Sequence, residues 1–169
     1  PCGKLPVTVS YNVGQIQTIY NHKASQYSRQ FALGHTGPLY PFGFGLSYTS
    51  YRYGKPVLSK DKIRKDESVT VSFDLTNTGK MDGTEIVQLY IRDEYGSITR
   101  PVKELKGFQR VFLKAGETKR VEFAVIPDDL KFYTVRKVWE VEPGDFTIMV
   151  GPSSADKDLQ KLALTVEGD

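Results

Sequence analysis

The chain has 169 residues, with 23 Lys+Arg against 20 Asp+Glu and 39% hydrophobic residues, which suits one domain of ordinary size plus an appendage. The net charge of +3 comes from scattered basic residues, which argues against nucleic acid or an acidic membrane surface as a partner, and no apolar run approaches the ~20 residues that cross a bilayer. The single cysteine, Cys2, excludes an internal disulfide framework, and no neighbouring group favours a reactive thiol.

Residues 1–49 do not form an independent domain. Residues 4–9 predict one strand, but nothing around it supplies a partner strand or a second apolar layer. The stretch that follows, as far as residue 37, is polar, dotted with aromatic residues and without periodicity. The chain also begins at Pro1 without a leader sequence, so we expect it to be a piece of a longer protein.

The linker at residues 38–49 combines chain breakers with large apolar side chains. A freely moving linker is rich in Gly, Ser or other polar residues, so we expect this one to lie against a protein surface. Its candidate domain-interface residues are Tyr40, Pro41, Phe42, Gly43, Phe44, Gly45 and Leu46. Because the strand at residues 4–9 also lacks ladder partners, we expect the isolated chain to self-associate.

From about residue 50 onward, apolar and polar residues alternate with period 2. Turn residues separate the alternating runs, and short strands at this spacing are typical of an antiparallel β-sandwich. The predicted fold class is therefore all-β, an immunoglobulin or fibronectin type III-like sandwich of about seven strands over residues 50–169. The strands are expected near residues 52–58, 69–77, 85–93, 104–113, 118–126, 138–141 continued by 144–151, and 160–167.

The alternation also predicts which side chains face the core. Buried positions are expected at Val71, Phe73, Leu89, Val121, Phe123, Ile148 and Leu164. Outward positions are expected at Thr70, Ser72, Gln88 and Thr147. Trp139 is expected in the sandwich core, because buried tryptophan is common in this fold, with an exposed sugar-stacking ring as the alternative. The tyrosines of the first strand are expected to clamp the linker: Tyr48, Tyr51 and Tyr53.

The titratable residues do not predict a catalytic or metal site within this chain. The acids sit mostly in turns or at polar strand positions, where water keeps them ionised: Asp61, Asp66, Asp82, Asp93, Glu94, Asp128 and Asp129. His22 and His35 lack the spacing of zinc ligands, so no metal or cofactor is predicted. A basic group, expected to make cross-strand ion pairs on the solvent face, comprises Lys103, Lys106, Arg110, Lys114, Lys119 and Arg120.

Several motifs follow one another along the chain: Gly-Lys-Leu-Pro-Val-Thr at 3–8, Asn-Val-Gly-Gln-Ile at 12–16, Tyr-Asn-His-Lys at 20–23, the linker at 39–49, Arg-Pro-Val-Lys-Glu-Leu-Lys-Gly-Phe at 100–108 and Ala-Gly-Glu-Thr at 115–118. Together, in this order, they resemble the carboxyl-terminal portion of glycoside hydrolase family 3, in particular its bacterial periplasmic or secreted β-glucosidases. The sequence departs from the family's usual pattern at Cys2, at Gln17 and over residues 24–30.

The resemblance implies a domain map. Residues 1–10 correspond to the last strand of the family's α/β-sandwich domain, residues 11–49 to the arm and linker, and residues 50–169 to a fibronectin type III-like domain. The family's aspartate nucleophile and glutamate acid/base lie in domains before residue 1, so no catalytic residue is carried over to this chain. His22 remains a weak candidate for a residue near the site of the missing domains.

We therefore expect a non-catalytic domain of a retaining β-glucosidase-like enzyme, periplasmic or secreted, which packs on the catalytic domains and meets substrate only through them. The alternative is a free-standing fibronectin-like module that binds polysaccharide or protein. Residues 1–49 discriminate between the two, because a free module has no use for a lone strand and an aromatic linker.

Overall fold

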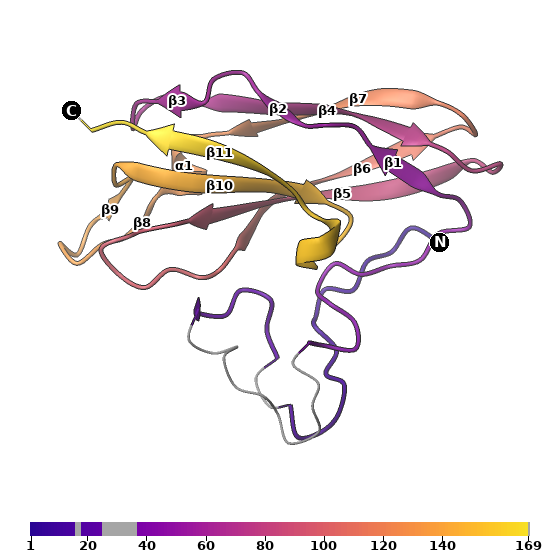
Figure 1. Ribbon diagram of the computed structural model, residues 1–169, viewed down its shortest axis with the longest axis horizontal. Coiled ribbons are helices and arrows are strands. Elements are labelled where there is room, and N and C mark those ends of the chain that lie inside the picture. Colours follow the sequence, from indigo (N-terminus) through magenta and orange to yellow (C-terminus); the bar gives the residue numbers. More distant parts are fainter. Residues whose placement is uncertain (16–17, 25–36, 169) are drawn as a thin grey trace.

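The computed structural model describes residues 1–15, 18–24 and 37–168, and its regular structure is almost entirely β (Figure 1). The strands are β1 (Tyr51–Tyr53), β2 (Val57–Leu58), β3 (Lys62–Ile63), β4 (Val69–Asn77), β5 (Gly83–Asp93), β6 (Glu104–Leu113), β7 (Thr118–Val125), β8 (Phe132–Tyr133), β9 (Trp139–Glu140), β10 (Gly144–Gly151) and β11 (Gln160–Val166). One helical turn, α1 (Pro127–Leu130), follows β7, and a 3₁₀ turn, η2 (Asp156–Asp158), precedes β11. No helix in these described ranges is long and apolar enough to span a bilayer.

Nine of the strands form two sheets that face each other, and β8 and β9 form a separate pair (Figure 1). In the smaller sheet β4 is central, with β7 along one edge and β1 and β2 in succession along the other, all antiparallel to it. The larger sheet has the order β3-β11-β10-β5-β6. All of its neighbours are antiparallel except β3, which pairs with β11 in parallel. The predicted all-β sandwich is confirmed.

The core lies between the two sheets and follows the predicted alternation. The seven core residues predicted from the alternation are all buried, and the most exposed of them, Phe123, retains only 6% of its surface. Thr70 and Thr147 are partly exposed, as their polar positions in β4 and β10 predict. The strand register predicted from the two-residue periodicity is therefore correct at these positions. Here one face of each strand packs against the opposite sheet and the other face meets water.

Two predicted outward residues are buried, and the prediction of their exposure is wrong. Ser72 is 8% exposed, because the guanidinium of Arg120 on β7 lies across it and donates to its hydroxyl at 2.6 Å. Gln88 is 3% exposed, because the outer face of β5 is covered by the linker. Polar side chains can occupy a buried face of a sheet when each of them has a hydrogen-bond partner.

Trp139 does not enter the core, contrary to the prediction. The segment from β8 to β9 forms its own hairpin, which lies at the end of the sandwich away from the N-terminus (Figure 1). Lys137, with φ of 62°, closes the turn between these strands. Trp139 is 65% exposed there. Of the tyrosines near the first strand, Tyr48 is 79% exposed, whereas Tyr51 and Tyr53 pack against the core.

Candidate functional site

The N-terminal segment and the linker pair with each other to form a short antiparallel ribbon. The amide of Leu5 donates to the carbonyl of Phe44, and the amide of Gly43 donates back to Leu5, both at 2.8 Å. Further along, Val9 and Tyr40 form an antiparallel bridge. The prediction that residues 4–9 lack ladder partners is therefore wrong, since the linker supplies them.

Gly43 is the point at which the ribbon meets the sandwich. Its φ of 78° lies in the left-handed region that favours glycine, and an added Cβ would approach the Gln88 side-chain oxygen to 2.0 Å. The Gln88 amide nitrogen donates to the carbonyls of Gly43, at 3.0 Å, and Pro152, at 2.7 Å. A neighbouring backbone bond runs from Ser154 N to the carbonyl of Phe42. One buried glutamine thus connects the linker to the loop between β10 and β11.

An aromatic cluster covers the outer face of β5 beside this contact. Tyr20 stacks on Phe42 with ring centroids 4.2 Å apart and meets the edge of Tyr90 at 5.8 Å. The Tyr90 hydroxyl donates to the side-chain oxygen of Gln88, while the Tyr20 hydroxyl accepts from the amide of Leu105. Burial raises the pKa of Tyr90 well above its ordinary value, so this hydroxyl stays a donor. The cluster is a second, smaller core between the linker and the sandwich.

A largely buried ion pair holds the other strand of the ribbon. The ammonium of Lys4 lies 2.9 Å from a carboxylate oxygen of Glu85, and the two side chains are 14% and 6% exposed. The Tyr53 hydroxyl donates to the same oxygen at 3.0 Å. Burial, with the charge of Glu85, raises the pKa of Tyr53 far above its ordinary value. The sequence did not predict a role for Glu85. The only indication was the position of this carboxylate within a mostly apolar strand.

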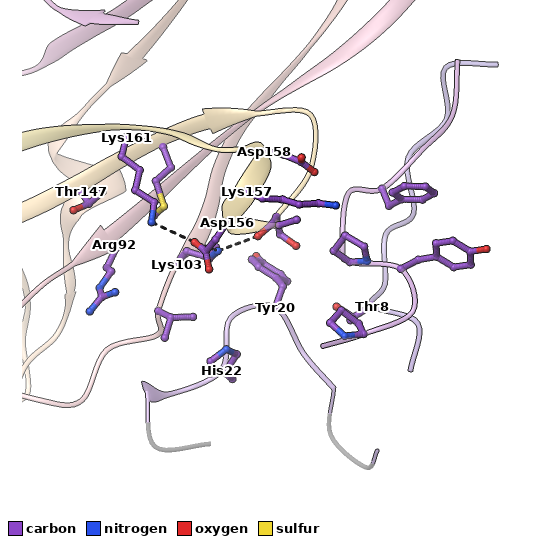
Figure 2. Close-up of a pocket in the computed structure, with 18 of the residues that line it drawn as sticks. Thr8, Tyr20, His22, Arg92, Lys103, Thr147, Asp156, Lys157, Asp158 and Lys161 are labelled. Carbon is purple, nitrogen blue, oxygen red and sulfur yellow. Dashed lines mark hydrogen bonds and ion pairs between the residues drawn. The ribbon is translucent and has the colours of Figure 1, made fainter. Parts of the chain in front are cut away.

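A cleft of about 690 Å³ separates the arm from the outer face of β10 and β5 (Figure 2). The arm and linker contribute Tyr20, His22, Tyr40 and Phe44 to its walls. The sandwich contributes polar and charged groups, chiefly Arg92, Glu94, Lys103, Thr147, Asp156 and Lys161. Three of the linker residues predicted from the sequence, Tyr40, Pro41 and Phe44, therefore line one side of a cleft whose other side is charged.

Lys103 is buried in the wall of this cleft, contrary to its predicted place on the solvent face. It is 5% exposed, and its ammonium donates to the carbonyl of Ser154 and to Asp156, both at 2.9 Å (Figure 2). Lys161 lies 3.4 Å from the same carboxylate. Burial alone would raise the pKa of Asp156, but the hydrogen bond from Lys103 and the two positive charges bring it below its ordinary value. The η2 turn therefore covers the Lys103 side chain, and its Asp156 carboxylate compensates the positive charge of Lys103.

His22 lines the cleft. Its ring Nδ1 is 2.9 Å from the carbonyl of Lys23, and its own carbonyl accepts from the amide of Val102 at 3.0 Å. His35, Gln17 and residues 25–30 lie outside the described residues. Within the described ranges, no three His, Cys, Asp or Glu side chains come together as a metal site.

Asp93 is the one acid in the predicted solvent-exposed group that the structure places in a buried environment. Its side chain is 7% exposed, and Arg100 Nε lies 3.6 Å from its Oδ2, beyond hydrogen-bonding distance. Burial raises the pKa of Asp93, and the Arg100 charge and the amide of Tyr95 oppose this effect. Arg100 also pairs with Glu104 at 2.7 Å and lies over the ring of Phe132. These contacts fix the loop between β5 and β6.

Comparison with known proteins agrees with this geometry. Residues 85–154 match the family model of the fibronectin type III-like domain. The chain is 44% identical over 170 residues to a β-xylosidase of Formosa agariphila, covering 99% of this chain and 24% of the relative. It is 40% identical over 165 residues to a periplasmic β-glucosidase of Salmonella typhimurium, covering 92% of this chain and 22% of the relative. The solved β-glucosidase EmGH1 of Erythrobacter marinus superposes with a TM-score of 0.93 at 42% identity, over 99% of this chain and 22% of that one.

The chain matches the carboxyl-terminal portion of glycoside hydrolase family 3 enzymes. It spans a little over a fifth of the length of these relatives and carries their fibronectin type III-like domain. The likeness covers the ribbon and linker as well as the sandwich, since nearly all of the chain aligns.

Proposed function

We propose that this chain is a non-catalytic structural unit of a retaining β-glucosidase- or β-xylosidase-like hydrolase. In this proposal residues 1–10 close the sheet of a preceding α/β-sandwich domain, residues 11–49 are the arm and linker, and residues 50–169 pack on the catalytic domains. The enzyme would cleave terminal, non-reducing β-D-glucosidic or β-xylosidic bonds in the periplasm or outside the cell. The periplasmic relative supports that location.

The observation that carries the proposal is the docked ribbon with an uncovered outer side. Its inner side is fixed through Gly43, Phe42 and Lys4, whereas Leu46 is 72% and Val7 56% exposed. Tyr40 is 41% exposed beside them. Several exposed apolar side chains on one docked ribbon are typical of an interface. The linker residues from Tyr40 to Leu46 are accordingly proposed as the interface with the catalytic domains.

An activity assay tests the non-catalytic assignment. Purified residues 1–169 are expected not to hydrolyse aryl β-glucosides or β-xylosides, whereas the longer protein that includes the upstream sequence is expected to hydrolyse one of them. Retaining glycosidases need two carboxyl groups ~5–5.5 Å apart, one of them with a raised pKa. Turnover by residues 1–169 that survives removal of host glycosidases, and is abolished by changing an acid in this chain, would refute the assignment.

A pair of surface variants tests the proposed interface. Leu46→Asp, in the longer protein, is expected to lower the thermal midpoint of the catalytic domains, because it buries a charge at the interface. Val135→Asp, at a residue 62% exposed on the β8–β9 turn, is the matched control and is expected to leave it unchanged. Equal effects of the two variants would contradict the interface.

The alternatives are a free-standing module and a self-associating chain. The free module predicts that Leu46→Asp changes nothing in any longer protein. Self-association uses the same apolar ribbon surface in the absence of the catalytic domains. Light scattering of residues 1–169 is then expected to show a concentration-dependent dimer, which Leu46→Asp dissociates. A wild-type chain that stays monomeric at every concentration would exclude self-association.

A further inference from the structure

A pair of exposed aromatic rings lies on the β8–β9 hairpin, at the end of the sandwich away from the N-terminal ribbon (Figure 1). The strand register places Tyr133 directly opposite Trp139, with ring centroids 5.8 Å apart and ring planes inclined by 59°. These residues are 48% and 65% exposed. Tyrosine and tryptophan normally bury most of a large apolar surface, so an exposed cross-strand pair points to a ligand.

The hairpin holds the two rings in place without any partner. The amide of Thr134 donates to the carbonyl of Val138 at 3.0 Å, and the Thr134 hydroxyl donates to Glu140 at 2.7 Å. Phe132, which precedes Tyr133, is 1% exposed and lies under the guanidinium of Arg100, 4.4 Å from the ring centroid. Because one strand of the hairpin is anchored in this way, little conformational entropy is lost when a ligand binds to the rings.

The two side chains also offer polar groups beside their apolar faces. Neither the Tyr133 hydroxyl nor the Trp139 indole N–H bonds to another group in the part of the chain that the structure describes. A pyranose ring presents a face of C–H groups and a rim of hydroxyls, which match an aromatic face and a nearby donor. We propose that Tyr133 and Trp139 form a binding site for a chain of β-linked glucose or xylose.

The size of the apolar surface favours a sugar chain over a protein partner. The exposed parts of the two rings, with Val135 and Val138 at the turn, amount to on the order of 400–500 Å². A stable protein interface needs about 800 Å² from each partner. Of the charges at the turn, Arg136 pairs with Glu140, and Lys137 is left without an ion pair among the described residues. One positive charge attracts an acidic polymer only weakly, so a neutral polysaccharide fits the hairpin better than an acidic polymer or a second protein.

The choice of β-linked glucose and xylose rests on the proposed function, whereas the presence of a site rests on the hairpin alone. A site on the sandwich that binds polymer would keep the catalytic domains close to chain ends. Attachment of this kind raises the effective concentration of substrate without any contact to the reacting bond. The effect is expected on polymeric substrate and not on aryl glycosides.

Affinity electrophoresis of residues 1–169 tests the site. Soluble mixed-linkage β-glucan or soluble xylan in the gel is expected to retard the wild-type chain, and dextran, an α-linked polymer, is not. Trp139→Ala and Tyr133→Ala are each expected to raise the dissociation constant about tenfold or more, because each variant loses one stacked ring. Phe108→Ala removes an aromatic residue, 67% exposed on β6, and is the matched control expected to bind as wild type.

A second readout uses the fact that Trp139 is the sole tryptophan of the chain. Cellotetraose or xylotetraose is expected to shift its fluorescence emission to shorter wavelength in a saturable way, with the same midpoint at low and high salt. Thermal midpoints of the variants are expected to match wild type, since both rings lie outside the core.

The proposal is overturned if neither β-linked polymer retards the wild-type chain, or if Trp139→Ala binds as well as wild type. It is also overturned if the wild-type chain forms a dimer that Trp139→Ala disperses, which would assign the rings to a protein interface. These results leave the aryl glycosidase activity of the longer protein untouched, so they are distinguishable from a failure of the proposed function.

Discussion

The sandwich and the N-terminal ribbon are stabilised by different kinds of contacts. In the sandwich, Phe73, Leu89 and Ile148 belong to one continuous buried core between two sheets. In the ribbon, stability comes from backbone pairing and from a few contacts to the outer face of β5, such as that of Gly43 with Gln88. The sandwich therefore carries its own hydrophobic core, whereas the ribbon depends on a surface that the sandwich provides.

The largest expected effect tests the core of the sandwich. Phe123→Ala is expected to lower the free energy of unfolding by ~3–5 kcal/mol, because it empties a buried aromatic site that cannot fully collapse. Thr70→Ala, at a partly exposed position of the neighbouring strand, is the control and is expected to change it by less than about 0.5 kcal/mol. Denaturant unfolding measures both, and equal shifts of the two midpoints would disprove the assigned core.

The next effect tests the contact between the ribbon and the sandwich. Gln88→Ala removes a donor to Gly43 and Pro152 and an acceptor for Tyr90, so it is expected to cost about 2–4 kcal/mol. The control is Gln109→Ala, on β6, whose side chain makes one exposed bond. Hydrogen exchange is expected to accelerate in Gln88→Ala at the amide of Ser154, which donates to the linker, more than at the β4 amides.

Gly43→Ala acts on the same contact from the other side. Its Cβ would clash with Gln88 and its positive φ would be strained, which together cost on the order of 1–3 kcal/mol. In the double variant Gly43→Ala with Gln88→Ala, the clash disappears, so the combined loss of stability is expected to be smaller than the sum of the single losses. Strict additivity of the two losses would show that Gly43 and Gln88 act independently.

The sequence predicted the sandwich better than it predicted the site. Period 2 identified the core because burial between the sheets selects apolar side chains such as Val71 and Phe123 at alternate positions. It failed at Gln88 and Lys103, whose burial depends on the linker and on η2, segments distant in sequence. The prediction also failed at Trp139. The strands β8 and β9 pair over only two residues each, which is too short for the alternation of apolar and polar residues to reveal a separate hairpin.

The smallest effect concerns pH and a buried carboxyl group of the sandwich. Burial raises the pKa of Asp93 in the folded chain above its unfolded value, near 3.9. The group's contribution to stability is therefore complete below the unfolded pKa and is lost as pH rises through the folded pKa. Asp93→Asn cannot ionise, so its stability relative to wild type is expected to increase as pH rises and then to level off above the folded pKa of Asp93.

Glu117→Gln provides the control with the opposite sign. The amide of Lys114 donates to this carboxylate and lowers its pKa, so Glu117 contributes stability above its unfolded pKa that is lost as pH falls. This variant is expected to lose stability relative to wild type as pH rises. Urea unfolding of both variants and wild type between about pH 3 and 7 measures the two differences. An Asp93→Asn curve that falls in parallel with that of Glu117→Gln would mean that Arg100, 3.6 Å from Asp93, outweighs the burial of that carboxylate.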